Sequence, residues 1–210
     1  MITVNSLQNN LKLTIEAQLF NNSSAEIDLS ALKKSIIQQL QRVYQTQIGK
    51  YVIDFSITIE IISTKWQCSP KKILIQVVDS VLNNNPAEAD FKGMRIKLNK
   101  NCIDDIIANK NTRTIPHEIG HLLGWDHPHA RSSYQSINLE ASELEQSLTE
   151  EERQVNLMSQ TWYAQKAGVD LEQAMQLTEK QIELLLEYSA KKELNKNFHL
   201  NYFLFWKKIV

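Results

Sequence analysis

The sequence contains little cysteine and no excess of charge of either sign. Cys68 and Cys102 are the only two cysteines among 210 residues, and this density excludes a small scaffold held together by several disulfides. They permit a single disulfide, and the sequence is compatible with either a disulfide or two free thiols. The 23 basic and 24 acidic side chains nearly cancel, so no large positive field indicates nucleic acid as a partner.

A long apolar run and a visible leader are also missing. No stretch approaches the roughly 20 apolar residues that a membrane-spanning helix requires, and the apolar run YFLFW at 202 to 206 is far too short. The first residues, MITVNSLQNN, contain no positively charged segment ahead of an apolar one, so no signal peptide is visible in this numbering. We therefore expect no transmembrane segment, and a hydrophobic fraction of 42% supplies a substantial core for one domain or two lobes.

Alternating hydrophobicity marks four strands in the first half of the chain. Residues 11 to 20 place leucine, isoleucine and alanine at every second position, between lysine, threonine, glutamate and glutamine, which is the period of a strand with one buried face. Residues 51 to 62 repeat this pattern with many β-branched side chains, and residues 73 to 78 and 94 to 98 give two shorter strands.

Helical spacing replaces the alternation between the first two strands. Apolar residues from Leu29 to Tyr44 recur along one helical face, with Ser30 as the expected N-cap and Gly49 just past the end. The first half therefore predicts the order β-α-β-β-β. Because a helix joins the first two strands, we expect them to be parallel, with the helix across one face of the sheet.

The second half of the chain loses the strand pattern. The segment to about residue 155 is polar and rich in glutamate, and we expect irregular chain there with one short helix at residues 149 to 154. Thr178 and Gln181 form a capping box, which predicts a late helix. The aromatic residues 198 to 210 either dock on the domain as an extra strand or contact a membrane surface or a partner.

The segment TIPHEIGHLLGWDHPH, residues 114 to 129, carries the chemistry, because it contains four of the five histidines. On a helix, His117 and His121 lie one turn apart and project from the same face, which suits two corners of a tetrahedral zinc site. Glu118 is rotated from them by about 100°. Its carboxylate can therefore reach a water in the site without being the nearest ligand, as a general base must.

A glycine explains how a third histidine joins the first two. Gly124 follows the helix and can adopt positive φ, so the chain can turn sharply and bring His127 back to the same point. Three imidazole ligands leave the fourth zinc position open, and an open position distinguishes a catalytic zinc site from a closed structural one.

The stretch HEIGHLLGWDH, from His117 to His127, resembles HExxHxxGxxH, the signature of the metzincin clan of zinc endopeptidases. The clan also places a methionine turn beneath the zinc histidines, and residues 156 to 159, NLMS, resemble that turn with Met158 as the methionine. The resemblance implies an α+β fold with a twisted mixed amino-terminal sheet, a backing helix and an active-site helix. It further implies an upper subdomain, 1 to 124, and an irregular lower subdomain, 125 to 210, that ends in a helix, within one catalytic domain.

The resemblance also implies an activity. A chain of this clan is a zinc-dependent endopeptidase for protein or peptide substrates, with Zn²⁺ held by His117, His121 and His127 and with Glu118 as general base toward a metal-activated water. The extended substrate would pair antiparallel with an edge strand, for which 94 to 98 and 73 to 78 are the candidates. An inhibitor or immunity protein is a further candidate partner. The alternatives are a non-catalytic zinc-stabilised interaction module and a zinc hydrolase of a non-peptide amide.

The family within the clan is less well marked. Pro128 follows the third histidine as in serralysins, but Gln160 stands where serralysins and astacins carry a tyrosine ligand. Tyr163 is close enough to be considered as that ligand, and Trp162 with Tyr163 could line the substrate pocket. The pattern favours a compact, bacterial relative of matrixins or serralysins. Because such peptidases usually act outside the cytosol, we expect an extracellular location or export by a leaderless route.

Other ligand sets compete with the three histidines. In a different zinc clan the third ligand is a glutamate about 20 residues after the second histidine, and Glu140 and Glu143 lie near that distance from His121. His129 could replace His127. Because His127 stands at the metzincin offset, we favour it over all three.

Overall fold

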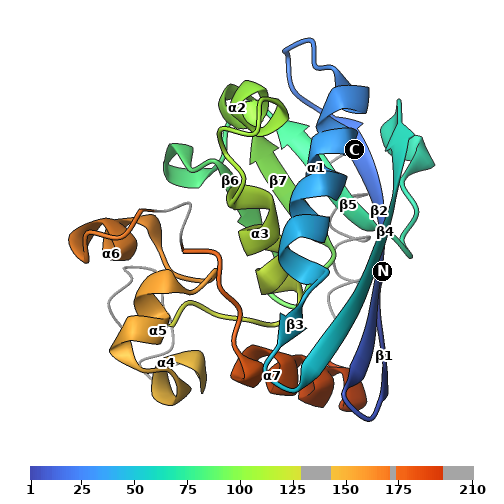
Figure 1. Ribbon diagram of the computed structural model, residues 1–210. Helices are drawn as coiled ribbons and strands as arrows, with labels where there is room; N and C mark the ends of the chain where they lie inside the picture. Colours follow the sequence, from blue (N-terminus) through green and yellow to red (C-terminus); the bar gives the residue numbers. More distant parts are fainter. Residues whose placement is uncertain (129–142, 171–173, 196–210) are drawn as a thin grey trace.

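The computed structural model describes residues 1 to 128, 143 to 170 and 174 to 195, apart from the side chains of residues 162 and 164. The fold is α+β, with one mixed sheet whose inner face is covered by helices α1 (Leu29–Tyr44) and α3 (Thr114–Leu122) (Figure 1). The predictions for His129, Glu140 and the aromatic residues 198 to 210 fall outside the described residues. No helix within the described ranges is long and apolar enough to cross a membrane.

The sheet has the strand order β3-β4-β2-β5-β7-β6, and β1 pairs with the first part of β2. Pairs β2–β4, β2–β5 and β5–β7 are parallel, whereas β1–β2, β3–β4 and β6–β7 are antiparallel. The strands are β1 Ile2–Leu7, β2 Asn10–Asn21, β3 Gln47–Ile48, β4 Tyr51–Ile62, β5 Ile73–Val78, β6 Ala87–Ala89 and β7 Arg95–Asn99.

Four of these strands confirm the sequence prediction. β2, β4, β5 and β7 lie within a residue or two of the predicted ranges, and β2 and β4 are parallel with α1 between them in the chain. The predicted edge strands are wrong, because β5 lies inside the sheet between β2 and β7, and β7 is covered by β6. The true edge at this side, β6, was not predicted since three residues, Ala-Glu-Ala, are too short to show a period.

The start of α1 also differs from the prediction. Asp28, not Ser30, is the N-cap: its Oδ1 accepts hydrogen bonds from the backbone N–H groups of Ser30 and Ala31, at 3.0 and 2.9 Å. A carboxylate there accepts hydrogen bonds from two amides that have no partner within the helix. Its negative charge also interacts favourably with the positive end of the helix dipole. Ser30 is therefore a residue of the first turn.

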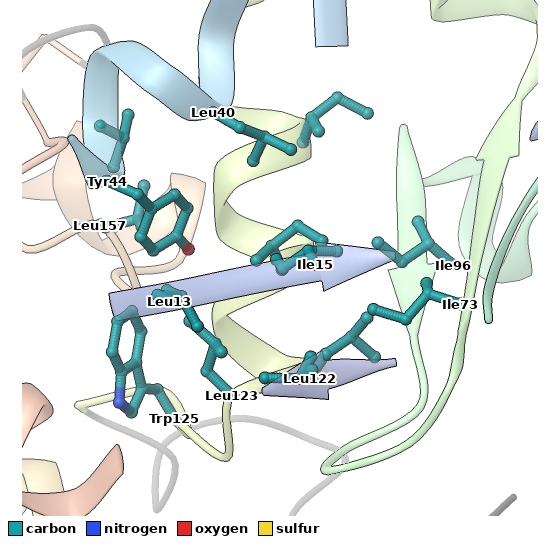
Figure 2. Close-up of a cluster of buried hydrophobic side chains, with 14 of the residues drawn as sticks. Leu13, Ile15, Leu40, Tyr44, Ile73, Ile96, Leu122, Leu123, Trp125 and Leu157 are labelled. Atoms are coloured by element: carbon teal, nitrogen blue, oxygen red, sulfur yellow. The ribbon is translucent and has the colours of Figure 1, made fainter. Parts of the chain in front are cut away.

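The buried core lies between the sheet and the two helices. Figure 2 shows side chains from β2, β5 and β7 packed against Leu122 and Leu123 at the end of α3, together with Trp125. The Tyr44 hydroxyl of α1 donates to the Pro116 carbonyl of α3 at 2.8 Å. Because Pro116 lies one residue before the first histidine of the motif, this hydrogen bond holds the start of the motif against α1.

The second half of the chain is more helical than predicted. The expected short helix is α5 (Glu150–Val155), whose capping box joins Thr149 and Glu152, and the expected late helix is α7 (Glu179–Ala190). Helices α4 (Glu143–Ser147) and α6 (Thr161–Lys166) were not predicted. Each is one or two turns long, so neither presents enough repeats of an apolar face to be recognised.

Cys68 and Cys102 are free thiols. The Cys102 thiol donates to the carbonyls of Asn99 and Pro86, at 2.9 and 3.1 Å, and burial raises its pKa to about 11. Burial raises the pKa of Cys68 as well, so both thiols are weak nucleophiles at neutral pH.

Candidate metal centre

Helix α3 and the turn after it bring three imidazoles to one point. His117 and His121 come from successive turns of α3, and His127 returns from the segment after Gly124. The potential ligand atoms of the three side chains all lie within 4.8 Å of one another, and the Nε2 atoms of His117 and His127 are 3.3 Å apart. The convergence predicted from the spacing is therefore present.

Backbone carbonyls fix the tautomers of the two helical histidines. Nδ1 of His117 lies 2.8 Å from the Leu157 carbonyl oxygen, and Nδ1 of His121 lies 2.9 Å from that of Trp125. Because a carbonyl oxygen only accepts, both Nδ1 atoms carry the proton and donate. The Nε2 lone pairs of both rings are then available for a metal ion, as in most histidine metal sites.

Burial keeps these two histidines neutral. Desolvation, followed by the nearby His121 and Arg113, lowers the pKa of His117 well below its usual value, and desolvation lowers the pKa of His121 as well. Neutral imidazole is the form that binds a metal.

The third histidine is held in a different way. Nδ1 of His127 lies 3.4 Å from the side-chain amide of Gln160 and 4.0 Å from Oδ1 of Asp126. Both neighbours are side chains, so neither is fixed as firmly as a backbone carbonyl. Gln160, at the position where serralysins and astacins carry a tyrosine ligand, faces Nδ1 of His127.

Gly124 is required for the turn that delivers His127. Its φ is +90°, which side chains rarely adopt, and a Cβ at this position would lie 2.7 Å from Cδ2 of Tyr188 in α7. Both the backbone angle and the close approach of α7 therefore demand glycine.

The methionine turn packs directly against α3. Met158 is fully buried, and a Cβ on Gly120 would meet its sulfur at 2.4 Å. The Met158 backbone N–H donates to Oδ1 of Asn156 at 2.9 Å, which closes the turn. Gly120 lies between His117 and His121, and the absence of a side chain there lets Met158 pack directly against this part of α3.

Arg113 anchors the same turn, and the sequence reasoning missed it. The arginine is buried at the start of α3; Nε donates to the Ala174 carbonyl at 2.9 Å, and Nη2 donates to the carbonyls of Leu157, at 2.7 Å, and Ser159. Leu157 thus accepts from both Arg113 and His117. An arginine four residues before the first histidine is a visible signal, but its acceptors lie 44 to 61 residues away and cannot be read from the sequence.

Glu118 lies in the cleft beside the imidazoles. It is only 7% exposed, and desolvation, with a smaller contribution from Glu88, raises its pKa to about 8 although Arg113 opposes the shift. A cation at the three histidines would favour its ionised form. The cleft has a volume of about 400 Å³; it is lined from the edge strand side by residues 85 to 89, from α3 by residues 113, 114, 117, 118 and 121, and otherwise by residues 127 and 159 to 161.

The remaining candidates lie elsewhere. The Tyr163 hydroxyl donates to Glu150 of α5, and Tyr163 is not among the residues that line the cleft, so its pocket role stays a prediction. The side chain of Trp162 lies outside the described residues. An oxygen of Glu143 lies 3.4 Å from the Tyr188 hydroxyl, and Glu143 does not join the metal-binding group found in the described ranges, which consists of the three histidines.

The donor set fits zinc. Two Zn–N bonds of about 2.0–2.1 Å at the tetrahedral angle separate their nitrogens by about 3.3 Å, and the Nε2 atoms of His117 and His127 are 3.3 Å apart. Three nitrogen ligands with an open side toward the cleft match a catalytic zinc site better than a closed structural one.

Comparisons with known proteins found distant structural likeness only. No protein-family model matches the chain, and no curated protein matches it significantly. One similar solved structure is an archaemetzincin from Methanopyrus kandleri, with 10% identity, a TM-score of 0.43, and coverage of 83% of this chain and 94% of that chain. Another is the malonate complex of an archaemetzincin from Archaeoglobus fulgidus, with 16% identity, a TM-score of 0.34, and coverage of 54% and 80%. Likenesses this distant do not identify the function of this chain.

Proposed function

We propose that this chain is a zinc-dependent endopeptidase of the metzincin type. His117, His121 and His127 would hold the zinc, and Glu118 would act as general base. One observation carries the proposal: the ligand atoms of three imidazoles converge in a cleft that a buried glutamate and the edge strand β6 also line.

The chain's own residues supply the proton transfers and the alignment. Zinc bound at this site would be the Lewis acid that activates water and polarises the scissile carbonyl. Glu118 accepts the proton of the attacking water and delivers it to the leaving amine nitrogen. The Leu157 carbonyl, which also accepts from Arg113, holds His117 in its Nδ1–H tautomer, so this ligand is oriented before substrate binds.

The edge strand β6, and not β5 or β7, is the strand with which a substrate can pair. It borders the cleft and is the terminal strand of the sheet order. An extended peptide would pair with β6 as an additional antiparallel strand, which places its backbone across the histidines. This mode selects an extended polypeptide over a small molecule.

Removal and return of the metal test the proposal. We expect the zinc-loaded protein to cleave peptides from a proteome-derived library, to lose cleavage after treatment with a chelator, and to regain it with one equivalent of zinc. Glu118→Gln should keep zinc and lose about 10²- to 10⁴-fold in turnover, whereas the matched exposed variant Glu151→Gln should cleave normally.

The same experiment separates the alternatives. Stoichiometric zinc without cleavage of any peptide would favour a non-catalytic zinc module, and cleavage confined to non-peptide amides in a substrate panel would favour a different zinc hydrolase. Wild-type turnover by Glu118→Gln would remove Glu118 from the role of base.

A further inference from the structure

The backbone hydrogen bonds of β6 determine which of its residues direct their N–H and C=O groups toward β7 and which direct them toward the free edge of the sheet. The Asn99 N–H donates to the Pro86 carbonyl at 2.8 Å, and the Asp90 N–H donates to the Arg95 carbonyl at 3.1 Å. Both pairs continue the β6–β7 register by one residue at each end. In an antiparallel pair, hydrogen-bonded and non-hydrogen-bonded positions alternate. Glu88 therefore directs its N–H and C=O toward β7.

Ala87 and Ala89 direct their backbone groups the other way. Their N–H and C=O groups point to the free edge, and within the described ranges no backbone hydrogen bond reaches them from another segment. A peptide added antiparallel at this edge would bond to Ala87 and Ala89. The peptide residue opposite Glu88 would then occupy a non-hydrogen-bonded position, where facing side chains are closest.

The side chain of Glu88 lies on the sheet face away from the core. Ile96 and Leu98 of β7 are fully buried against the helices, and they pair with Ala89 and Ala87. Glu88 and its partner Lys97 alternate with these residues, so both lie on the opposite face. The Lys97 ammonium contacts Oε1 of Glu88, and the two side chains are 32% and 36% exposed.

We infer that Glu88 forms a subsite for a lysine or arginine side chain of the substrate, at the residue that pairs opposite it. This inference rests on the proposed function, because it requires a peptide at the β6 edge. Across the three strands the side chains would be Lys97, Glu88 and the basic side chain of the substrate. Each charged side chain would therefore lie next to one of opposite sign. A carboxylate accepts through both oxygens, and contact with Lys97 through Oε1 leaves Oε2 able to accept from the substrate.

An acidic substrate residue at this position would be repelled. Opposite charges directly across a strand pair are favourable and like charges unfavourable, each by a modest amount. We therefore expect peptides with lysine at this position to bind about three- to tenfold more tightly than peptides with glutamate there. Because the site is partly exposed, this ratio should shrink as salt rises.

A lysine scan and a glutamate scan of one neutral host peptide test the inference through binding. The zinc-loaded Glu118→Gln protein is titrated with each peptide, and binding is read by fluorescence anisotropy, so the result does not depend on turnover. We expect one position at which lysine strengthens and glutamate weakens binding. The preference should disappear in a Glu88→Gln background and reverse in Glu88→Lys. Asp54→Asn, an exposed change on the distant strand β4, should leave it intact.

Three results would overturn the inference: no peptide binding, no position with a charge preference, or a preference that survives Glu88→Gln. Peptide cleavage by the wild-type protein together with either of the last two would leave the proposed function in place. Loss of cleavage with an intact lysine preference would instead remove the proposed function alone.

Discussion

At the scale of single residues, the site divides into what is local in the chain and what is not. His117, Glu118, His121, Gly124 and His127 lie within one helix and one turn, so helix geometry alone predicts that the imidazoles meet. His121 has a local partner in Trp125, but the partners of His117 and His127 come from far along the chain, 40 and 33 residues away. No sequence period encodes such contacts, and they were found only in the structure.

The third ligand is the residue whose assignment is easiest to test. We expect His127→Ala to weaken zinc binding by about 100-fold or more, because one of three nitrogen ligands is removed. His129→Ala, the other histidine considered for this role, should bind zinc like the wild type. Competition with a chromogenic chelator measures both affinities. If His129→Ala gave the larger loss, the third ligand would have to be reassigned.

At the scale of elements, length decided which predictions succeeded. The 12-residue strands β2 and β4 and the 16-residue helix α1 show enough repeats to reveal their period, and their parallel pairing followed from the helix between them. Strand β6, with three residues, shows none. That short strand forms the edge of the sheet, so the wrong prediction of the edge and the missed subsite at Glu88 share one cause.

The contact between α3 and the methionine turn predicts the effect of a single methyl group. Gly120→Ala would place Cβ 2.4 Å from the sulfur of Met158, and the overpacking should cost about 1–3 kcal/mol in the free energy of unfolding. Urea denaturation of the metal-free protein measures this cost. Met158→Ala in the same chain should relieve it, so a double variant as stable as Met158→Ala alone is expected. Additive losses in the double variant would show that the two residues do not touch.

Arg113 predicts a second link between these elements. Arg113→Met would leave three buried carbonyl groups without their charged donor, and we expect a loss of about 2–4 kcal/mol in the free energy of unfolding. Arg113→Lys should recover only part of it, since an ammonium lacks the planar fork of donors. The exposed variant Arg42→Met should change stability by less than about 0.5 kcal/mol. Equal stability of Arg113→Met and the wild type would mean that the hydrogen bonds from Arg113 to the three carbonyl groups are not formed.

At the scale of the whole molecule, one buried core joins the halves of the chain. Trp125, Leu157, Met158 and Leu185 belong to the same cluster as the sheet residues, and the Trp125 indole donates to the Gln181 carbonyl of α7 at 2.8 Å. The expected subdivision at residue 124 stays a prediction. At this scale the sequence predicted the α+β class and the order of the long elements. The packing of the second half could not be predicted, because it depends on contacts between residues far apart in the chain.

Because the metal ligands come from α3 and from the chain after it, zinc should stabilise the entire fold. At a free zinc concentration a thousandfold above Kd, binding to the native state alone adds about 4 kcal/mol, which raises Tm by roughly 10 °C for a chain of this size. Differential scanning calorimetry with zinc and with chelator measures the shift. The His117→Ala, His121→Ala double variant should show none, and an equal shift in that variant would place the stabilising zinc elsewhere.

The central claim is that three imidazoles of this chain hold one zinc ion. Anomalous diffraction at the zinc absorption edge, on crystals grown with one equivalent of zinc, tests it most directly. We predict one peak within bonding distance of the Nε2 atoms of His117, His121 and His127, at the base of the cleft beside Glu118. A peak held by other side chains, or density showing these three rings turned away from a shared centre, would contradict the account.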